Sequence, residues 1–297
     1  MPNGEKIVTA GDGRDIEVVT FGDPQGPTVV FHHGTPGCAS TARAFETFAL
    51  DAGLFVLCAS RPGYGNSTAL PGRNVAAVVE DVTAVLDAWG RNEYIAVGWS
   101  GGGPHALACA ALDAPRCVAA WSLAGVAPYG AGFDWTEGMG PENVEEFELS
   151  VAGGPDYQAF LDEVVQLHSH ATAENYINLF GALISHADLV ALAPESVRAA
   201  MAASDRHAFA HGVAGYRDDD RVFVSPWGFD VTSIDVPIAI WFGDDDLMVP
   251  PTHGRWLAAN IPTATEVFHP GHGHFDMVLT DGAQLAADLS AMASIGR

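Results

Sequence analysis

Residues 93–105 read Glu93-Tyr94-Ile95-Ala96-Val97-Gly98-Trp99-Ser100-Gly101-Gly102-Gly103-Pro104-His105. An apolar, β-prone run enters a Gly-x-Ser-x-Gly turn made by Gly98, Ser100 and Gly102, and an alanine-rich segment typical of a helix follows. A serine at such a strand-turn-helix connection needs a strained backbone to lift its hydroxyl clear of the sheet, and the residues two before and two after it crowd together, which favours glycine. The alternative is a glycine-rich turn with a bystander serine, and the pentapeptide alone does not decide between the two.

The composition limits the partners more than it limits the reaction. The chain has 297 residues, 48% of them hydrophobic, and a net charge of −24 with Lys6 as its only lysine. This charge argues against nucleic acid or an anionic membrane as a partner. Without an 18-residue apolar stretch or a signal-peptide pattern, the sequence predicts a soluble, cytoplasmic protein, which we expect to be a monomer or homodimer. The four cysteines lack a Cys-x-x-Cys pattern and are expected to be reduced.

Short apolar runs alternate with helical periodicity over most of the chain. Lys6–Ala10 and Asp15–Phe21 read as strands of a hairpin, because Gly11-Asp12-Gly13 separates them. Further strands are expected at Thr28–Phe31, Leu54–Ala59, Val118–Val126, Pro237–Phe242 and Thr265–Phe268, and helices at Thr41–Ala52, Val75–Trp89, His105–Leu112, Thr252–Asn260 and from about Gly282. Such alternation of buried strands and helices predicts a parallel sheet covered on both faces.

The alternation stops between about residues 128 and 230. This stretch has no convincing strand pair and reads as helices at Pro141–Leu149, Asp156–His168, Ala173–Leu189 and Pro194–Phe209. Structureless loops of this length are uncommon, so residues 128–230 are predicted to form an inserted helical cap, and residues 1–127 with 231–297 the core domain. The acidic runs Glu142–Glu148 and Asp218-Asp219-Asp220 are expected to be solvated faces.

Candidate acids and bases follow the last two predicted strands. Asp244-Asp245-Asp246 comes after Pro237–Phe242, and His269-Pro270-Gly271-His272-Gly273-His274 after Thr265–Phe268. The order Ser, acid, His, each just past the carboxyl end of a strand, is typical of nucleophilic catalysis on an α/β sheet. From this order alone, three aspartates compete for the acid and His272 competes with His274 for the base, whereas His269 is interpreted as a packing or surface residue.

These motifs together resemble those of the α/β-hydrolase superfamily with a helical cap, and the resemblance covers nearly the whole chain. His33-Gly34-Thr35-Pro36-Gly37 resembles the oxyanion loop of that family, and Arg61–Ser67 resembles the turn after its fourth strand. Gly98–Gly102 resembles the nucleophile elbow, Asp246–Pro250 the surroundings of the acid, and Gly273-His274-Phe275 those of the base. The resemblance implies an α/β-hydrolase fold: a mostly parallel eight-stranded sheet, helices on both faces and an inserted helical cap.

The resemblance also implies roles for individual residues. Ser100 is the expected nucleophile, His274 the base and Asp246 the acid that orients it, with Asp244 and Asp245 as less favoured acids. The backbone N–H groups of Thr35 and Gly101 are expected to form an oxyanion hole. His33 and Gly34 are expected to support that loop, and Gly98 and Gly102 the elbow. The aromatic candidates for a substrate pocket are Trp99, Phe133, Trp135, Phe147, Tyr157, Tyr176 and Phe180.

The favoured function is a serine hydrolase that cleaves an ester or related acyl bond of a small, partly apolar substrate. Alternatives are an aminopeptidase resembling proline iminopeptidases, a carbon–carbon bond hydrolase or lyase with the same triad, and a ligand-binding protein that keeps the triad. No cofactor is expected. The pairs His168 with His170 and His207 with His211 have ligand-like spacing, but they lack further ligand motifs, so no metal is expected either.

Overall fold

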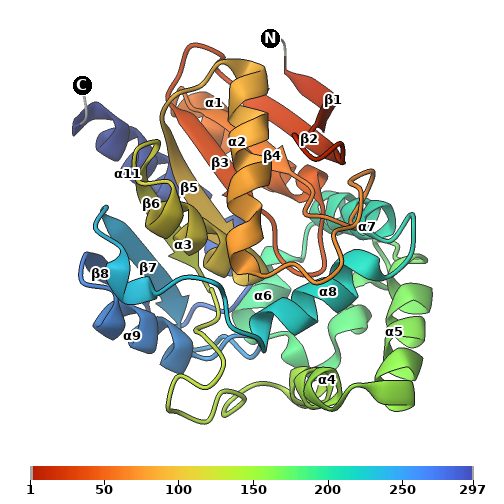
Figure 1. The fold of residues 1–297 in the computed structure, drawn as a ribbon. Coiled ribbons are helices and arrows are strands. Elements are labelled where there is room, and N and C mark those ends of the chain that lie inside the picture. Colours follow the sequence, from red (N-terminus) through yellow and green to blue (C-terminus); the bar gives the residue numbers. More distant parts are fainter. Residues whose placement is uncertain (1–2, 296–297) are drawn as a thin grey trace.

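The computed structural model describes residues 3–295, and its centre is an eight-stranded sheet (Figure 1). The strand order is β1-β2-β4-β3-β5-β6-β7-β8, in which β3 to β8 run parallel and β2 pairs antiparallel with both β1 and β4. The strands are β1 (Gly4–Thr9), β2 (Asp15–Gly22), β3 (Thr28–His32), β4 (Phe55–Ala59), β5 (Tyr94–Trp99), β6 (Cys117–Leu123), β7 (Ile238–Gly243) and β8 (Ala264–His269). The predicted mostly parallel sheet of the α/β-hydrolase fold is confirmed.

Helices cover both faces of this sheet. The α-helices are α1 (Glu46–Asp51), α2 (Val78–Trp89), α3 (Gly103–Leu112), α4 (Pro141–Ala152), α5 (Gly154–His168), α6 (His186–Ala191), α7 (Glu195–Ala208), α8 (Ala214–Phe223), α9 (Pro251–Asn260), α10 (Asp276–Leu279) and α11 (Gly282–Ile295). Helices α2 and α3 pack together over one face, and α1 and α11 pack together over the other (Figure 1). Every residue of β3 and of β5 is buried, because these central strands have helices on both sides.

The segment between β6 and β7 contains α4 to α8, which lie together beside one edge of the sheet (Figure 1). We call residues 128–230 the cap, and its division from the core stays a prediction. Two expectations inside the cap were wrong. The helix expected over Ala173–Leu189 is a 3-10 helix, Tyr176–Leu183, followed by α6, because Gly181 adopts a non-helical backbone with φ 53°. Helix α8 was not anticipated.

A similar difference affects the first predicted helix. Residues Ala39–Phe45 form a 3-10 helix and α1 begins only at Glu46, whereas one continuous helix was expected over Thr41–Ala52. Short 3-10 segments also occupy Val75–Ala77, Ser100–Gly102 and Val231–Ser233. In residues 3–295, no helix combines the length and the apolar character that crossing a membrane requires.

Candidate active site

Ser100 lies on a strained turn between β5 and α3. Its φ is 54°, a left-handed backbone conformation that residues other than glycine rarely adopt. A Cβ atom at Gly98 would come within 2.1 Å of the Gly102 carbonyl oxygen, and one at Gly102 within 2.1 Å of the His32 carbonyl oxygen. Both positions therefore require glycine, for the steric reason that the sequence suggested. Ser100 lines a cavity at this turn.

His274 and Asp246 are brought together from the ends of two neighbouring strands, β8 and β7. His274 Nδ1 lies 2.8 Å from Asp246 Oδ2, and both residues are only 2% exposed. The other Asp246 oxygen accepts the backbone N–H groups of Met248 and Val249 at 2.9 and 2.8 Å. Since a carboxylate only accepts, Nδ1 carries the proton of a neutral His274, and Nε2 is left as the basic nitrogen.

The electrostatics of His274 suit a base that becomes charged. Burial lowers its pKa, but the charge of Asp246 and the hydrogen bond to it raise the pKa more, and the net pKa is above the ordinary value. The charges of Asp188 and Asp276 act in the same direction. An imidazolium formed during a reaction would therefore be stabilised at this position.

The loop of His274 contacts the serine turn through Trp99. The Trp99 indole N–H donates to the His274 carbonyl oxygen at 3.1 Å, and the two rings lie 5.5 Å apart. The hydrogen bonds found within residues 3–295 do not include one between Ser100 and His274. Such bonds are often long in unliganded enzymes and tighten when substrate binds.

The competing acids and histidines lie elsewhere. Asp244 is exposed and accepts the backbone N–H of Gly271 at 2.6 Å. His269 and His272 approach the carboxylate of Asp281, at 3.0 and 3.4 Å, instead of Asp246. The ligand atoms of these two histidines and of Asp281 lie within 4.8 Å of one another. Among the described residues, this is the group whose spacing suits a metal ion.

The histidines of the two metal-like pairs seen in the sequence bond to other groups. His168 pairs with Asp205 at 2.8 Å, and His207 pairs with Glu17 at 2.7 Å. His170, just after α5, bonds the Gln166 carbonyl of that helix, and His211 contacts Asn66. Each of these histidines therefore has a protein partner.

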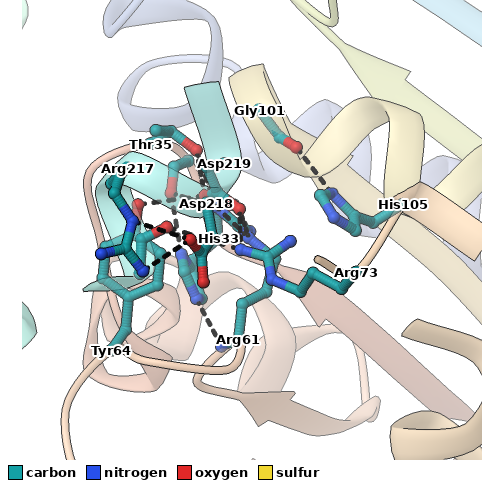
Figure 2. A network of polar contacts seen from close by, with 12 residues as sticks. His33, Thr35, Arg61, Tyr64, Arg73, Gly101, His105, Arg217, Asp218 and Asp219 are labelled. Atoms are coloured by element: carbon teal, nitrogen blue, oxygen red, sulfur yellow. Dashed lines mark hydrogen bonds and ion pairs between the residues drawn. The ribbon is translucent and has the colours of Figure 1, made fainter. Parts of the chain in front are cut away.

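The loop after β3 lies beside the serine turn, as Figure 2 shows. Thr35 and Gly101 line the same cavity as Ser100. His33 is fully buried: its Nε2 accepts the Arg61 backbone N–H at 3.0 Å, so its Nδ1 carries the proton and donates to the Gly34 carbonyl at 2.7 Å. Both ring nitrogens are thus committed to the backbone, and burial holds the pKa of His33 well below its ordinary value. This is the geometry of a loop support.

The cavity at Ser100 has a volume of about 690 Å³ and lies between the core and the cap, both of which contribute lining residues. Its apolar lining includes Phe147, Phe180, Phe223 and Met248. Its charged lining is acidic, with Glu142, Glu145, Glu146, Asp156 and Glu163 and neither lysine nor arginine. The acidic run Glu142–Glu148 was expected to be solvated. Glu145 and Glu148 are exposed, as expected, but Glu142, Glu145 and Glu146 also line this cavity.

The expected aromatic lining needs correction. Phe180 and Phe147 line the cavity, but Trp99, Phe133 and Trp135 do not, and neither do Tyr157 and Tyr176. Trp99 packs on His274 and Phe275. Phe133 and Trp135 pack edge-on against His253, and the Trp135 indole N–H donates to the Ala127 carbonyl. Phe133 and Trp135 therefore connect the start of the cap to His253 of the core, whereas Trp99 packs within the core.

Two buried aspartates near the site were missed in the sequence. Asp219, in α8, is completely buried beside Thr35, although its run was expected to be a solvated face. Asp188, in α6, is also completely buried and accepts the backbone N–H groups of Phe275 and Asp276, directly after His274. Ser185 and Asp188 form a capping box, whose Ser-x-x-Asp spacing was a visible signal. No sequence signal marked Asp219.

The chain was also compared with known proteins. A family model described as the alpha/beta hydrolase fold matches residues 27–280. A non-heme haloperoxidase of Rhodococcus erythropolis is 27% identical over 298 residues, covering 95% of this chain and 97% of that protein. A bifunctional esterase/perhydrolase of Acinetobacter calcoaceticus is 35% identical over 97 residues, which is 32% of this chain and only 35% of that relative.

Solved structures agree with this assignment of the fold. An esterase from Rhodococcus superposes with a TM-score of 0.69 at 18% identity, covering 98% of both chains. A bromoperoxidase from Bacillus anthracis reaches 0.71 at 19% identity, covering 98% of this chain and 100% of that one. The family and the esterase relatives support a hydrolase. Because the family model spans most of the sequence, the chain belongs to the α/β-hydrolase family.

Proposed function

We propose that this protein is a serine hydrolase that cleaves a carboxylic ester or related acyl bond through an acyl-enzyme on Ser100. The observation that carries the proposal is the strained Ser100, which opens into a cavity of about 690 Å³ beside Thr35 and Gly101. The buried His274–Asp246 pair, linked to the same turn by Trp99, supplies a base. The esterase relatives support the choice of an ester.

The proposed reaction has two halves. His274 Nε2 takes the Ser100 proton while Oγ attacks the acyl carbon, and the backbone N–H groups of Thr35 and Gly101 stabilise the oxyanion. His274 then gives its proton to the departing alkoxide, which leaves as an alcohol. Water, deprotonated by His274, attacks the acyl-enzyme and releases the acid and Ser100. Throughout, Asp246 orients the imidazole and stabilises its charged form.

The acidic cavity lining favours a second candidate within the same chemistry. Five carboxylic residues line the cavity in which a substrate would lie, together with His168 but with neither lysine nor arginine. Such a lining favours a substrate that carries a positive charge. An aminoacyl ester or amide has this property, and its cleavage would correspond to the alternative that resembles proline iminopeptidases.

The test compares the parent protein with Ser100→Ala on p-nitrophenyl butyrate. We expect turnover by the parent and a loss of about 10³-fold or more in the variant, as removal of a catalytic serine produces. A fluorophosphonate probe should label the parent at Ser100, with the added mass located by peptide mapping. Aminoacyl p-nitroanilides then distinguish the second candidate from the ester hydrolase.

The outcomes separate the alternatives. Labelling at Ser100 without turnover of esters or aminoacyl amides would direct the search to other bonds, carbon–carbon bonds among them. A folded parent that shows neither labelling nor turnover would overturn the proposal and favour a binding protein.

A further inference from the structure

The carboxylate of Asp219 links the cap to the loop after β3 (Figure 2). Its Oδ2 accepts the Thr35 hydroxyl at 2.6 Å, Arg61 Nη2 at 2.7 Å and the Tyr64 hydroxyl at 3.0 Å. Its Oδ1 accepts Arg73 Nη2 at 2.5 Å. Asp219 is fully buried, and both arginine side chains are only 2% exposed. A cap residue thereby holds two core arginines in place.

Arg61 in turn holds the backbone of the loop. Its guanidinium donates to the carbonyl oxygens of His33 and Gly34, the latter at 2.8 Å from Nη2. His33 Nδ1 donates to the same Gly34 oxygen. The Gly34 carbonyl and the Thr35 N–H belong to one planar peptide group, in which C=O and N–H point in opposite directions. Fixing the Gly34 oxygen therefore fixes the direction of the Thr35 N–H.

The Thr35 side chain is fixed by the same cluster. Its hydroxyl has one proton, which is donated to Asp219, and it accepts a hydrogen bond from Arg61 Nη2 at 2.8 Å. A Cβ atom at Gly101 would lie 2.3 Å from Thr35 Oγ1, so this hydroxyl lies directly against Gly101. The proposed oxyanion donors, the N–H groups of Thr35 and Gly101, are therefore spaced by a side chain that Asp219 orients.

We propose that Asp219 is a positioning residue that, through Arg61 and the Thr35 hydroxyl, aims the Thr35 N–H at the oxyanion of the reaction. This inference rests on the serine hydrolase proposed above. It assigns α8 a role in the chemical step: the cap completes the oxyanion hole, as well as covering the substrate. Misdirecting the N–H weakens binding of the oxyanion, which exists only in the transition state, and leaves binding of the uncharged substrate intact.

The main test is Asp219→Asn, with Tyr64→Phe as its matched control. Both variants remove a group from the same buried cluster, but Tyr64 donates to Asp219 without bonding Thr35 or the Gly34 peptide. For Asp219→Asn we expect kcat on p-nitrophenyl butyrate to fall about 10- to 100-fold, somewhat less than the loss of a whole oxyanion donor, with KM changed less than about threefold. Tyr64→Phe should keep kcat within about threefold of the parent.

A second pair of variants covers the case in which Asp219→Asn does not fold. Thr35→Val keeps the backbone N–H and removes the hydroxyl, whereas Thr35→Ser keeps both. We expect Thr35→Val to lower kcat about 10-fold at nearly unchanged KM, and Thr35→Ser to restore it to within about threefold. A trifluoromethyl ketone that forms a tetrahedral adduct should bind the two impaired variants more weakly by the same factors.

The inference and the proposed function fail in different ways. If the parent lacks Ser100-dependent turnover, the proposed function fails. If the parent turns over normally but folded Asp219→Asn keeps its kcat, or loses only KM, the inference is overturned and the hydrolase remains. Equal losses in Tyr64→Phe and Asp219→Asn, or in Thr35→Val and Thr35→Ser, would also overturn it, because they would indicate a purely structural cluster.

Discussion

Asp219 and Asp188 occupy comparable positions but are stabilised in different ways. Each is a fully buried cap residue that holds a loop beside Ser100. Asp219 is surrounded by charge: burial raises its pKa, but Arg61 and Arg73 outweigh burial and hold the pKa well below its ordinary value. Asp188 is bonded instead by neutral groups, namely the backbone N–H groups of Phe275, Asp276 and Ser185 and the Ser185 hydroxyl.

The difference shows two ways to keep a carboxylate buried between a cap and a core. Charge balance makes a strong connection, but removing the aspartate leaves two guanidinium groups without their counter-charge in the interior. Balance by backbone N–H groups leaves only neutral donors unsatisfied when the aspartate is removed. The close packing at Asp188 also explains the glycine before His274, since a Cβ atom at Gly273 would lie 2.2 Å from Ser185 Oγ.

The largest expected effect is on the free energy of unfolding, which should respond differently to replacement of the two aspartates. Asp219→Ala should lower the free energy of unfolding by about 3–5 kcal/mol, as breaking a buried ion pair does. Asp188→Ala leaves only neutral donors behind, each of which costs about 1–3 kcal/mol if it finds no new partner. Urea unfolding followed by circular dichroism measures both. Equal losses would show that the charges around Asp219 do not govern its stability.

A smaller expected effect tests whether the hydrogen bonds of Ser185 and Asp188 to the loop of His274 influence kcat. Ser185→Ala removes the cap of α6 and should lower the free energy of unfolding by about 1 kcal/mol. Asn74→Ala removes a comparable cap, which accepts the Ala77 N–H away from His274, and serves as the control. Only Ser185→Ala should also lower kcat. Unchanged turnover in both variants would confine Ser185 to a local structural role.

The smallest effect is a shift of the pH profile. A general base must be neutral, so kcat/KM should rise with pH as His274 loses its proton. Burial lowers the pKa of His274, and Asp246, Asp188 and Asp276 raise it. Asp188→Asn removes one of these negative charges, so the acid limb should move to lower pH. Asp219→Asn should leave that limb in place. Movement in Asp219→Asn alone would contradict this assignment of charges.

The sequence indicated the placement of the main site residues because their signals are local. Ser100, Asp246 and His274 each follow a recognisable apolar strand within a few residues, and parallel strands bring their carboxyl ends to one edge of the sheet. The steric need for glycine at Gly98 and Gly102 is also local, since it depends on a turn of five residues. Local patterns of this kind require no knowledge of distant partners.

Helix α8 was missed because its buried face is acidic. Asp218, Asp219 and Asp220 are all buried, whereas helix prediction relies on apolar residues at regular spacing. The partners that make Asp219 stable, Arg61 and Arg73, lie 158 and 146 residues earlier in the chain. A run of three aspartates read alone indicates solvent. Only the folded arrangement reveals the two arginines that face it.

The acidic cavity bears on how the enzyme would complete its cycle. The proposed cleavage of an ester at Ser100 would leave a carboxylate in a cavity lined by five acidic residues, within a chain of net charge −24. Like charges repel, so this lining disfavours a bound anion. The field that admits a neutral or positively charged substrate would thus expel the acid as it forms. Product release would be fast, and the accumulated acid would be a weak inhibitor.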